Sequence, residues 1–82
     1  MINTPSYPVR SLRQAGAALR SRRAARRISQ TQLGEMTGTA QSTISDIENG
    51  VVSVSLDVYL RLLEGLGAEL SVTHRLVDRE PS

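Results

Sequence analysis

The sequence predicts an all-α domain of about four helices, closed by a C-terminal β-strand that pairs across a dimer. Apolar residues recur at helical spacing through most of the chain, with capping residues before these segments and glycines after them. After residue 67 the apolar period changes to two, which is typical of a half-buried strand. The 82 residues are therefore divided into an N-terminal arm at 1–10, a helical domain at 11–67, a strand at 68–77 and a tail at 78–82.

An arm and a first helix open the chain. Pro5 and Pro8 oppose a helix in the arm, which we expect to be flexible. Ser11 with Gln14 three residues later forms a capping box, so a helix should follow and end at about Arg26. The residues expected to point inward from it are Leu12, Ala15, Ala18 and Leu19.

Two short helices joined by a tight turn are predicted next. Ser29 with Gln32 is a second capping box, so a helix begins at about Gln30. Leu33 and Met36 are its expected inward residues. Gly38 lies where the chain must reverse, because glycine takes a positive φ without steric cost.

The second of these helices has two unlike sides. Thr39 is expected to cap it, and it should run over residues 40–48, before Asn49 and Gly50 end it. Ile44 and Ile47 point inward at helical spacing. The outward residues are Gln41, Ser42, Ser45 and Asp46.

Those outward side chains are short and polar, so the helix backbone can approach the floor of a DNA major groove. The alternative is an ordinary solvated helix face. The residues themselves favour DNA reading, because the Glu and Lys that usually fill exposed helix positions are largely missing from this face.

A fourth helix and a strand complete the domain. Ser55 caps the helix, Asp57 lies favourably in its first turn, and Gly65 and Gly67 mark its end. Its apolar face is predicted to contain Leu56, Tyr59, Leu60, Leu63 and Leu66.

The strand that follows has no second strand in the chain to pair with. We therefore expect two copies to pair this strand antiparallel, with a frayed tail as the alternative. The strand face expected at the dimer contains Leu70, Val72, His74 and Leu76.

Composition narrows the function classes. Residues 1–34 carry a net charge of +7 and residues 35–82 a net charge of −5, so one half of the chain suits a polyanion. The alternative is a solvated Arg-rich helix without a partner.

The chain has no cysteine and one histidine, and it shows no catalytic triad, phosphate loop or paired-carboxylate pocket. We expect no enzyme activity, metal site or cofactor. With no apolar run of membrane-spanning length, the expected location is the cytoplasm.

The stretch from Ser29 to Gly50 resembles the helix-turn-helix of the Cro and phage-repressor (Xre-type) family. The likeness includes the Gln that opens the first motif helix, the turn Gly, and the runs Gln–Ser–Thr–Ile–Ser and Ile–Glu–Asn–Gly. It extends from about Leu19 to Leu66. Gly34 departs from the family, which usually has Ala there, and we expect either residue to be small enough for the helix packing.

The resemblance implies a DNA-binding domain at residues 11–67 with a lambda-repressor-like fold. Base contacts are expected from Gln41, which suits adenine, and from Ser42, Ser45 and Asp46. Phosphate contacts are expected from Gln30, Thr43, Asn49 and Arg20. The family often has basic residues in the loop at 51–54, which are missing here. Arg10, Arg13 and Arg20 are the unranked candidates to compensate.

The same resemblance implies a structural ion pair between Arg23 and Glu48, partly buried between helices.

The C-terminal order of a last helix followed directly by a strand resembles that of the HipB-type antitoxins. These are dimeric repressors that bind their own operators and hold a HipA-like kinase toxin. This implies a homodimer on palindromic double-stranded DNA, with recognition helices about 34 Å apart. Two alternatives are a phage-like or restriction-controller regulator without a toxin, and a protein-binding adaptor.

Overall fold

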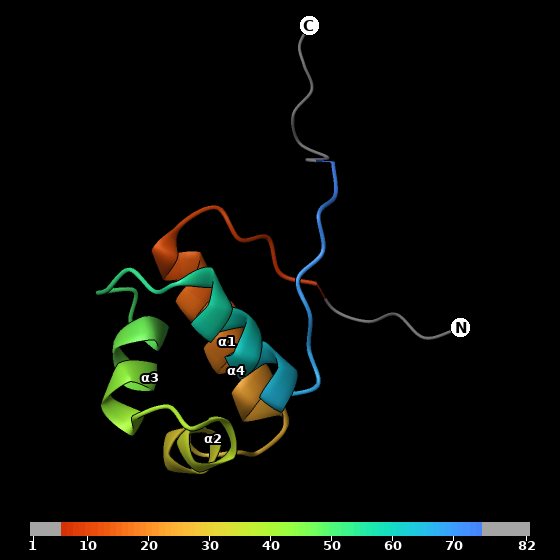
Figure 1. Cartoon of the computed structure of the whole chain (residues 1–82). Helices are drawn as coiled ribbons and strands as arrows, with labels where there is room; N and C mark the ends of the chain where they lie inside the picture. Colours follow the sequence, from red (N-terminus) through yellow and green to blue (C-terminus); the bar gives the residue numbers. More distant parts are fainter. Residues whose placement is uncertain (1–5, 75–82) are drawn as a thin grey trace, which may run out of the picture.

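Four helices form a bundle in the computed structural model, which describes residues 6–74 (Figure 1). Helix α1 spans Leu12–Ala25, α2 Gln30–Thr37, α3 Gln41–Glu48 and α4 Leu56–Gly65. Helix α1 packs against α3, and α2 packs against both α3 and α4. The prediction of an all-α domain with four helices is confirmed for these residues. None of these helices is long and apolar enough to cross a membrane.

Every helix contributes to one small core. Its members are Leu19, Leu33, Ile44, Ile47, Tyr59, Leu62, Leu63 and Leu66. Burying an apolar side chain of this size contributes about 1.5–3 kcal/mol. The hydroxyl of Tyr59 donates to the carbonyl of Ala15 at 2.7 Å and so joins α4 to α1. Burial disfavours the phenolate and raises the pKa of Tyr59 above its ordinary value.

Four side chains that were predicted to point inward are exposed instead, namely Leu12, Met36, Leu56 and Leu60. Leu12 and Leu56 are the first residues of their helices and lie beyond the core. On α2 the positions turned inward are Leu33, Gly34 and Thr37, so Met36 falls to one side of that stripe and is 54 % exposed. Short helices have narrow buried stripes, and simple spacing rules overestimate their width.

The helix starts follow the predicted capping chemistry only in part. Ser29 and Gln32 form the reciprocal capping box, with bonds of 3.0 and 2.8 Å. Ser11 accepts from the Gln14 amide, but the Gln14 side chain accepts from the backbone of Arg10 instead of closing a box.

The predicted cap on α3 is wrong. The N-cap is Ala40, without a side-chain bond, because α3 begins one residue later than expected. Thr39 instead pairs its hydroxyl with that of Thr37 at 3.1 Å.

Three helices end in the same hydrogen-bonded turn. After α1, α3 and α4 the chain enters the left-handed region at Arg27, Gly50 and Gly67, with φ of 57°, 69° and 68°. At each end two amides bond back to carbonyls of the last turn, which is the Schellman arrangement. Arg27 alone of the three has a side chain, so its backbone carries a steric cost that the glycines avoid.

Two glycines allow the helices to approach closely. A Cβ atom built on Gly16 in α1 would overlap the carbonyl oxygen of Ile47, so the backbones of α1 and α3 touch. A Cβ on Gly34 would overlap the carbonyl oxygen of Thr39. The expectation that alanine would also be small enough at Gly34 is therefore wrong in this chain, because the turn after α2 folds directly over that position.

Arg23 of α1 and Glu48 of α3 form a bidentate ion pair. Arg23 Nε donates to Glu48 Oε2 at 2.6 Å and Nη2 donates to Oε1 at 2.9 Å. Arg23 Nη1 also donates to the carbonyl of Ile28 at 2.9 Å. The side chain of Glu48 is 2 % exposed and that of Arg23 is 16 % exposed. The hydrogen bonds that Arg23 donates to Glu48, with the charge of that carboxylate, raise the pKa of Arg23 against the opposing effect of burial.

The segment after α4 leaves the bundle and runs past the N-terminal arm (Figure 1). Residues 6–74 contain no strand within the single chain. Leu70, Val72 and His74 are exposed there, Val72 fully so, and Leu76 lies outside the described residues. Residues 68–74 of the predicted strand therefore pair with no other strand in the described part of the chain.

Replacing Glu48 with Ala should lower the free energy of unfolding by about 3 kcal/mol, because Arg23 would remain partly buried without its partner. Chemical denaturation measures the change. The matched control is Asp57→Ala, which removes the exposed α4 pair with Arg61 and should cost less than about 0.5 kcal/mol. Equal effects of the two substitutions would contradict this account.

Replacing Arg27 with Gly should raise the free energy of unfolding by about 1 kcal/mol, because glycine relieves the left-handed strain at the end of α1. Gly67→Ala, at the equivalent position after α4, should change stability in the opposite direction. A loss of stability in Arg27→Gly, measured in the same denaturant series, would show that the side chain contributes more than the strain costs.

Candidate nucleic-acid interface

Helix α3 presents one side to the core and the other to solvent. Ile44 is fully buried and Ile47 is 3 % exposed, which fixes the rotation of the helix about its axis. On the other side Gln41, Ser42 and Asp46 are exposed, and Ser45 is half-buried. All four predicted base-reading side chains therefore remain accessible on one short helix.

Gln30 connects the ion pair to the start of α3. Its Nε2 donates to Glu48 Oε1 at 3.0 Å, and its Oε1 accepts from Gln41 Nε2 at 2.6 Å. The structure thus brings together, in a single chain of hydrogen bonds, Arg23 and Glu48, Gln30 and Gln41.

The charge of Glu48 determines which group donates in each of these hydrogen bonds. An ionised carboxylate only accepts, so Glu48 requires the NH₂ end of the Gln30 amide. The oxygen of Gln30 then points toward Gln41, so Gln41 must donate to it from its own NH₂ group. Gln41 keeps one N–H and its oxygen free. A donor and an acceptor side by side are the pair that adenine requires at N7 and N6.

Gln30 and Gln41 were assigned separate roles from the sequence, and their contact was missed. They lie 11 residues apart, each at the first position of its helix. A helix-turn-helix brings two such positions together, so the signal was present in the spacing but needed the angle between the helices. Gln30 retains one N–H for the expected phosphate contact.

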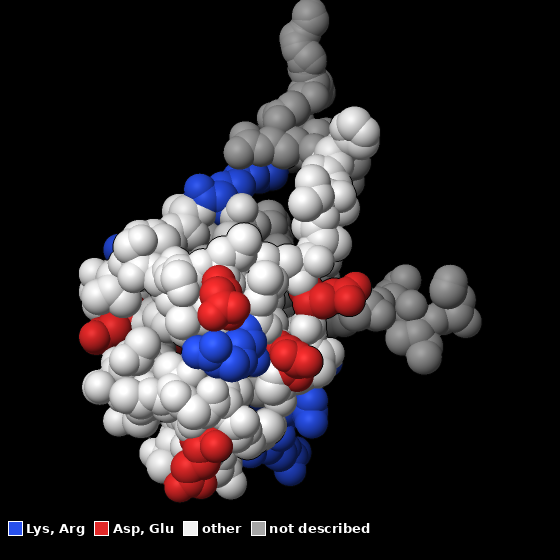
Figure 2. Space-filling model, in the orientation of Figure 1, with Lys and Arg blue, Asp and Glu red and all other residues white. Residues whose placement is uncertain are grey.

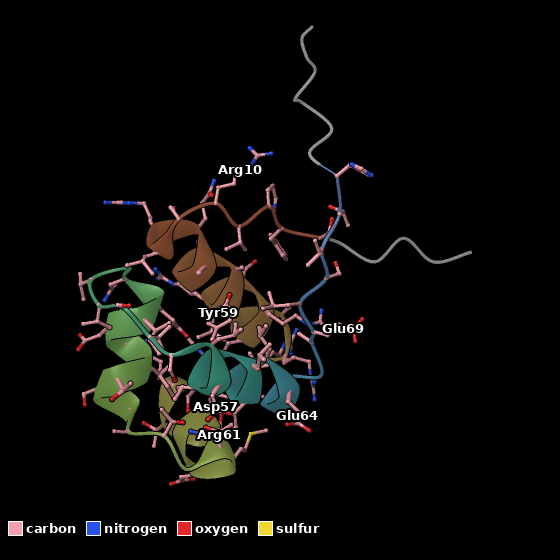
Figure 3. All side chains as sticks on the ribbon, turned by 45° about the horizontal axis from the view of Figure 1, so that its top comes forward. Arg10, Asp57, Tyr59, Arg61, Glu64 and Glu69 are labelled. Atoms are coloured by element: carbon pink, nitrogen blue, oxygen red, sulfur yellow. The ribbon has the colours of Figure 1, made fainter. Side chains whose placement is uncertain are left out.

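The remaining predicted phosphate residues lie around α3. Thr43 is half-buried on α3, and Asn49 is exposed at its end. Arg20 and Asn49 line a shallow groove between α1 and the end of α3, together with Arg13. Arg10 lies apart from them at the start of α1, where it lines the space between the arm and the C-terminal segment (Figure 3).

Acidic side chains gather on a different face. Figure 2 shows this face, where red patches surround a small blue one and most other blue atoms lie at the rim. Figure 3 places Asp57, Arg61 and Glu64 along α4, and Arg61 contacts Asp57 at 3.4 Å. Among residues 6–74 no group of acidic or histidine side chains could hold a metal ion. The described part of the chain therefore separates an acidic α4 side from the arginines of α1.

Comparisons with known proteins bear on this geometry. A family model described as a helix-turn-helix domain matches residues 14–76. A Mycobacterium tuberculosis protein named "Putative antitoxin HigA2" is 38 % identical over 61 residues, which cover 73 % of this chain and 60 % of that protein. The chain thus spans less than two thirds of the length of this relative.

Solved structures share the arrangement of helices. The restriction-modification controller protein C.AhdI from Aeromonas hydrophila superposes with a TM-score of 0.68 at 34 % identity, covering 71 % of this chain and 88 % of that one. HipB in a HipB-O4 20mer complex superposes with a TM-score of 0.76 at 23 % identity, covering 84 % and 97 %. The second likeness concerns the fold. Together with the family model, these matches show that the chain belongs to the helix-turn-helix domain family, in the Cro/phage-repressor (Xre-type) group that its motif resembles.

Proposed function

We propose that this protein is a sequence-specific DNA-binding transcriptional repressor that inserts α3 into the major groove. The observation that carries the proposal is the two-sided α3. Ile44 and Ile47 lock one side into the core, while Gln41, Ser42 and Ser45 face outward. A helix held in this way presents short polar groups to base edges with little freedom to rotate.

Base reading in this proposal centres on Gln41. Its amide is held by Gln30, which lowers the conformational entropy lost on binding. Ser42 and Ser45 can bond to either base type, and Asp46 can accept from the amino group of cytosine. Asp46 also repels phosphate, so it favours a position over base edges.

Phosphate contacts flank this centre. Gln30 can donate its remaining N–H at the start of α2, where helix amides also favour an anion. Thr43, Asn49 and Arg20 supply further contacts around α3. Because these contacts release counterions, binding should weaken steeply with salt.

The proposed active form is a homodimer on a palindromic operator. Leu70 is 42 % exposed and Val72 fully exposed, although both are apolar and alternate with polar neighbours. Pairing this segment with its copy would satisfy its backbone amides and cover both side chains. Two α3 helices would then face successive major grooves about 34 Å apart.

We further propose that the repressor is the antitoxin of a toxin–antitoxin operon, regulating its own promoter and binding a HipA-like kinase toxin. The 38 % identity with a protein named as an antitoxin supports this role. A solved complex named HipA-HipB-O2-O3 contains a chain that superposes with a TM-score of 0.75. The 34 % identity with C.AhdI supports the second candidate, a restriction controller without a toxin. A neighbouring kinase gene would favour the antitoxin, and a neighbouring methyltransferase or endonuclease gene would favour the controller.

Replacing Gln41 with Ala should weaken binding to the DNA upstream of the gene by about 5- to 150-fold, equivalent to about 1–3 kcal/mol. Fluorescence anisotropy with that duplex and with a mixed-sequence duplex measures the specific and the general affinity. Gln14→Ala, an exposed change on α1, should leave both unaffected.

Combining Gln30→Ala with Gln41→Ala tests the hydrogen-bonded link. The double variant should lose less binding free energy than the sum of the single variants, because Gln30 acts partly through Gln41. Failure of the wild-type protein to bind any duplex, including its own upstream region, would overturn the proposed function.

Replacing Val72 with Lys should convert the homodimer to a monomer, because a charge would be placed on the apolar face of the paired strands. Sedimentation equilibrium measures the mass. The controls Ser71→Lys and Thr73→Lys lie on the other strand face and should leave the dimer intact. A wild-type protein that sediments as a monomer at micromolar concentration would refute the strand pairing.

A further inference from the structure

A shallow basic groove lies beside the recognition helix, between α1 and the end of α3. Its volume is about 420 Å³, and it is lined by Arg13, Ala17, Arg20, Ser21, Ala24, Glu48 and Asn49. Five of these residues come from a single side of α1, with spacings of four, three, one and three residues. The groove therefore combines two arginines of one helix with the residue that ends the other.

The spacing along α1 leaves room between the arginines. Arg13 and Arg20 lie two helical turns apart, which is about 10 Å along the axis. Ala17 stands between them, and Ala24 follows Arg20 by one turn. Because alanine side chains are short, they leave space above the helix at these positions. The extended backbone of a ligand could lie in that space, between the long side chains of Arg13 and Arg20.

Neither arginine of the groove is paired with an acid in the described part of the chain. Within residues 6–74 the ion pairs involve Arg23 and Arg61, and neither Arg13 nor Arg20 takes part in one. Glu48 lines the groove, but both of its carboxylate oxygens are bound, by Arg23 and Gln30. The carbonyls of Ser45, Ile47 and Asp46 in the last turn of α3 likewise accept from the backbone amides of Asn49, Gly50 and Val51. The charge of the Glu48 carboxylate at this end is thus already paired with Arg23.

We infer that this groove binds a phosphodiester of the operator backbone, held by the guanidinium groups of Arg13 and Arg20 with the side-chain amide of Asn49. The inference rests on the proposed function, because α3 in the major groove brings a DNA strand past the end of that helix. The arginine spacing and the low floor between them suit a continuous chain of phosphates rather than an isolated anion. A guanidinium offers paired N–H groups that match two phosphate oxygens.

This assignment gives α1 a second role beside its packing on α3. The loop at 51–54 contains no basic residue, so the groove would replace the phosphate contacts that the loop cannot provide. It also distinguishes the arginines of α1 from one another. Arg22 lies on another side of the helix, where it lines the space between the arm and the C-terminal segment.

The test compares charge removal on two sides of α1. The variant Arg13→Gln/Arg20→Gln removes both groove arginines, and Arg22→Gln is the control on the same helix. Each is titrated into a fluorescein-labelled mixed-sequence duplex of about 20 base pairs, from about 50 mM to about 250 mM salt. Thermal melting by circular dichroism checks that all variants remain folded.

The groove variant should bind about tenfold more weakly per lost arginine at about 50 mM salt. The slope of log affinity against log salt should become shallower by about 0.9 for each phosphate contact removed. Arg22→Gln should leave the slope as in the wild type, and Arg13→Lys/Arg20→Lys should restore most of it, because lysine keeps the charge. The preference for the upstream duplex over the mixed-sequence duplex should stay unchanged, since phosphate contacts carry no base information.

The inference is overturned if wild-type protein binds the duplex and the groove variant shows the same slope. It is also overturned if the groove variant and Arg22→Gln change the slope equally, because a general charge effect would then suffice. These outcomes leave the proposed function standing. If the folded wild-type protein binds no duplex, the proposed function and the inference fall together.

Discussion

The carboxylate of Glu48 is the group on which the rest of the site depends. It is almost completely buried, and a buried charge of this kind is tolerated only when its lone pairs are bonded. Arg23 and Gln30 supply those bonds, and in doing so they fix α1, α2 and the end of α3 relative to one another. Gln41 receives its orientation from the far end of the same chain. One interior interaction therefore sets both the arrangement of three helices and the direction of a side chain on the surface.

Local chemistry in the sequence predicted most of the fold. The four helices, the capping box at Ser29 and the left-handed turn at Gly38 follow from rules that act over three or four residues. The errors fell where longer-range geometry decides. Met36 has helical spacing from Leu33, yet the packing of α2 leaves it exposed. At Gly34, the fold of the following turn removes the space that an alanine would need.

The candidate site was predictable as a set of residues but not as a connected unit. Exposed polar positions on α3 can be read from the burial of Ile44 and Ile47. The bond between Gln30 and Gln41 cannot, because it depends on how two helices cross. The groove at Arg13 and Arg20 has the same origin. Its side chains share one face of α1 by spacing alone, but only the packing of α1 on α3 brings Asn49 to that face. Sequence periodicity describes single helices, whereas binding surfaces are made between them.

The missing side chain at Gly16 has a mechanical consequence. With the backbones of α1 and α3 in direct contact, there is no layer of flexible side chains at this point to absorb relative motion. The two helices should therefore move together as one rigid unit. In the proposed complex with DNA, any tilt that moves Gln41 across a base pair would then also move Arg13 and Arg20 along the neighbouring strand. A bent or overwound duplex would then change the base contacts and the sugar–phosphate contacts together. Binding would in this way depend on DNA shape as well as on base identity.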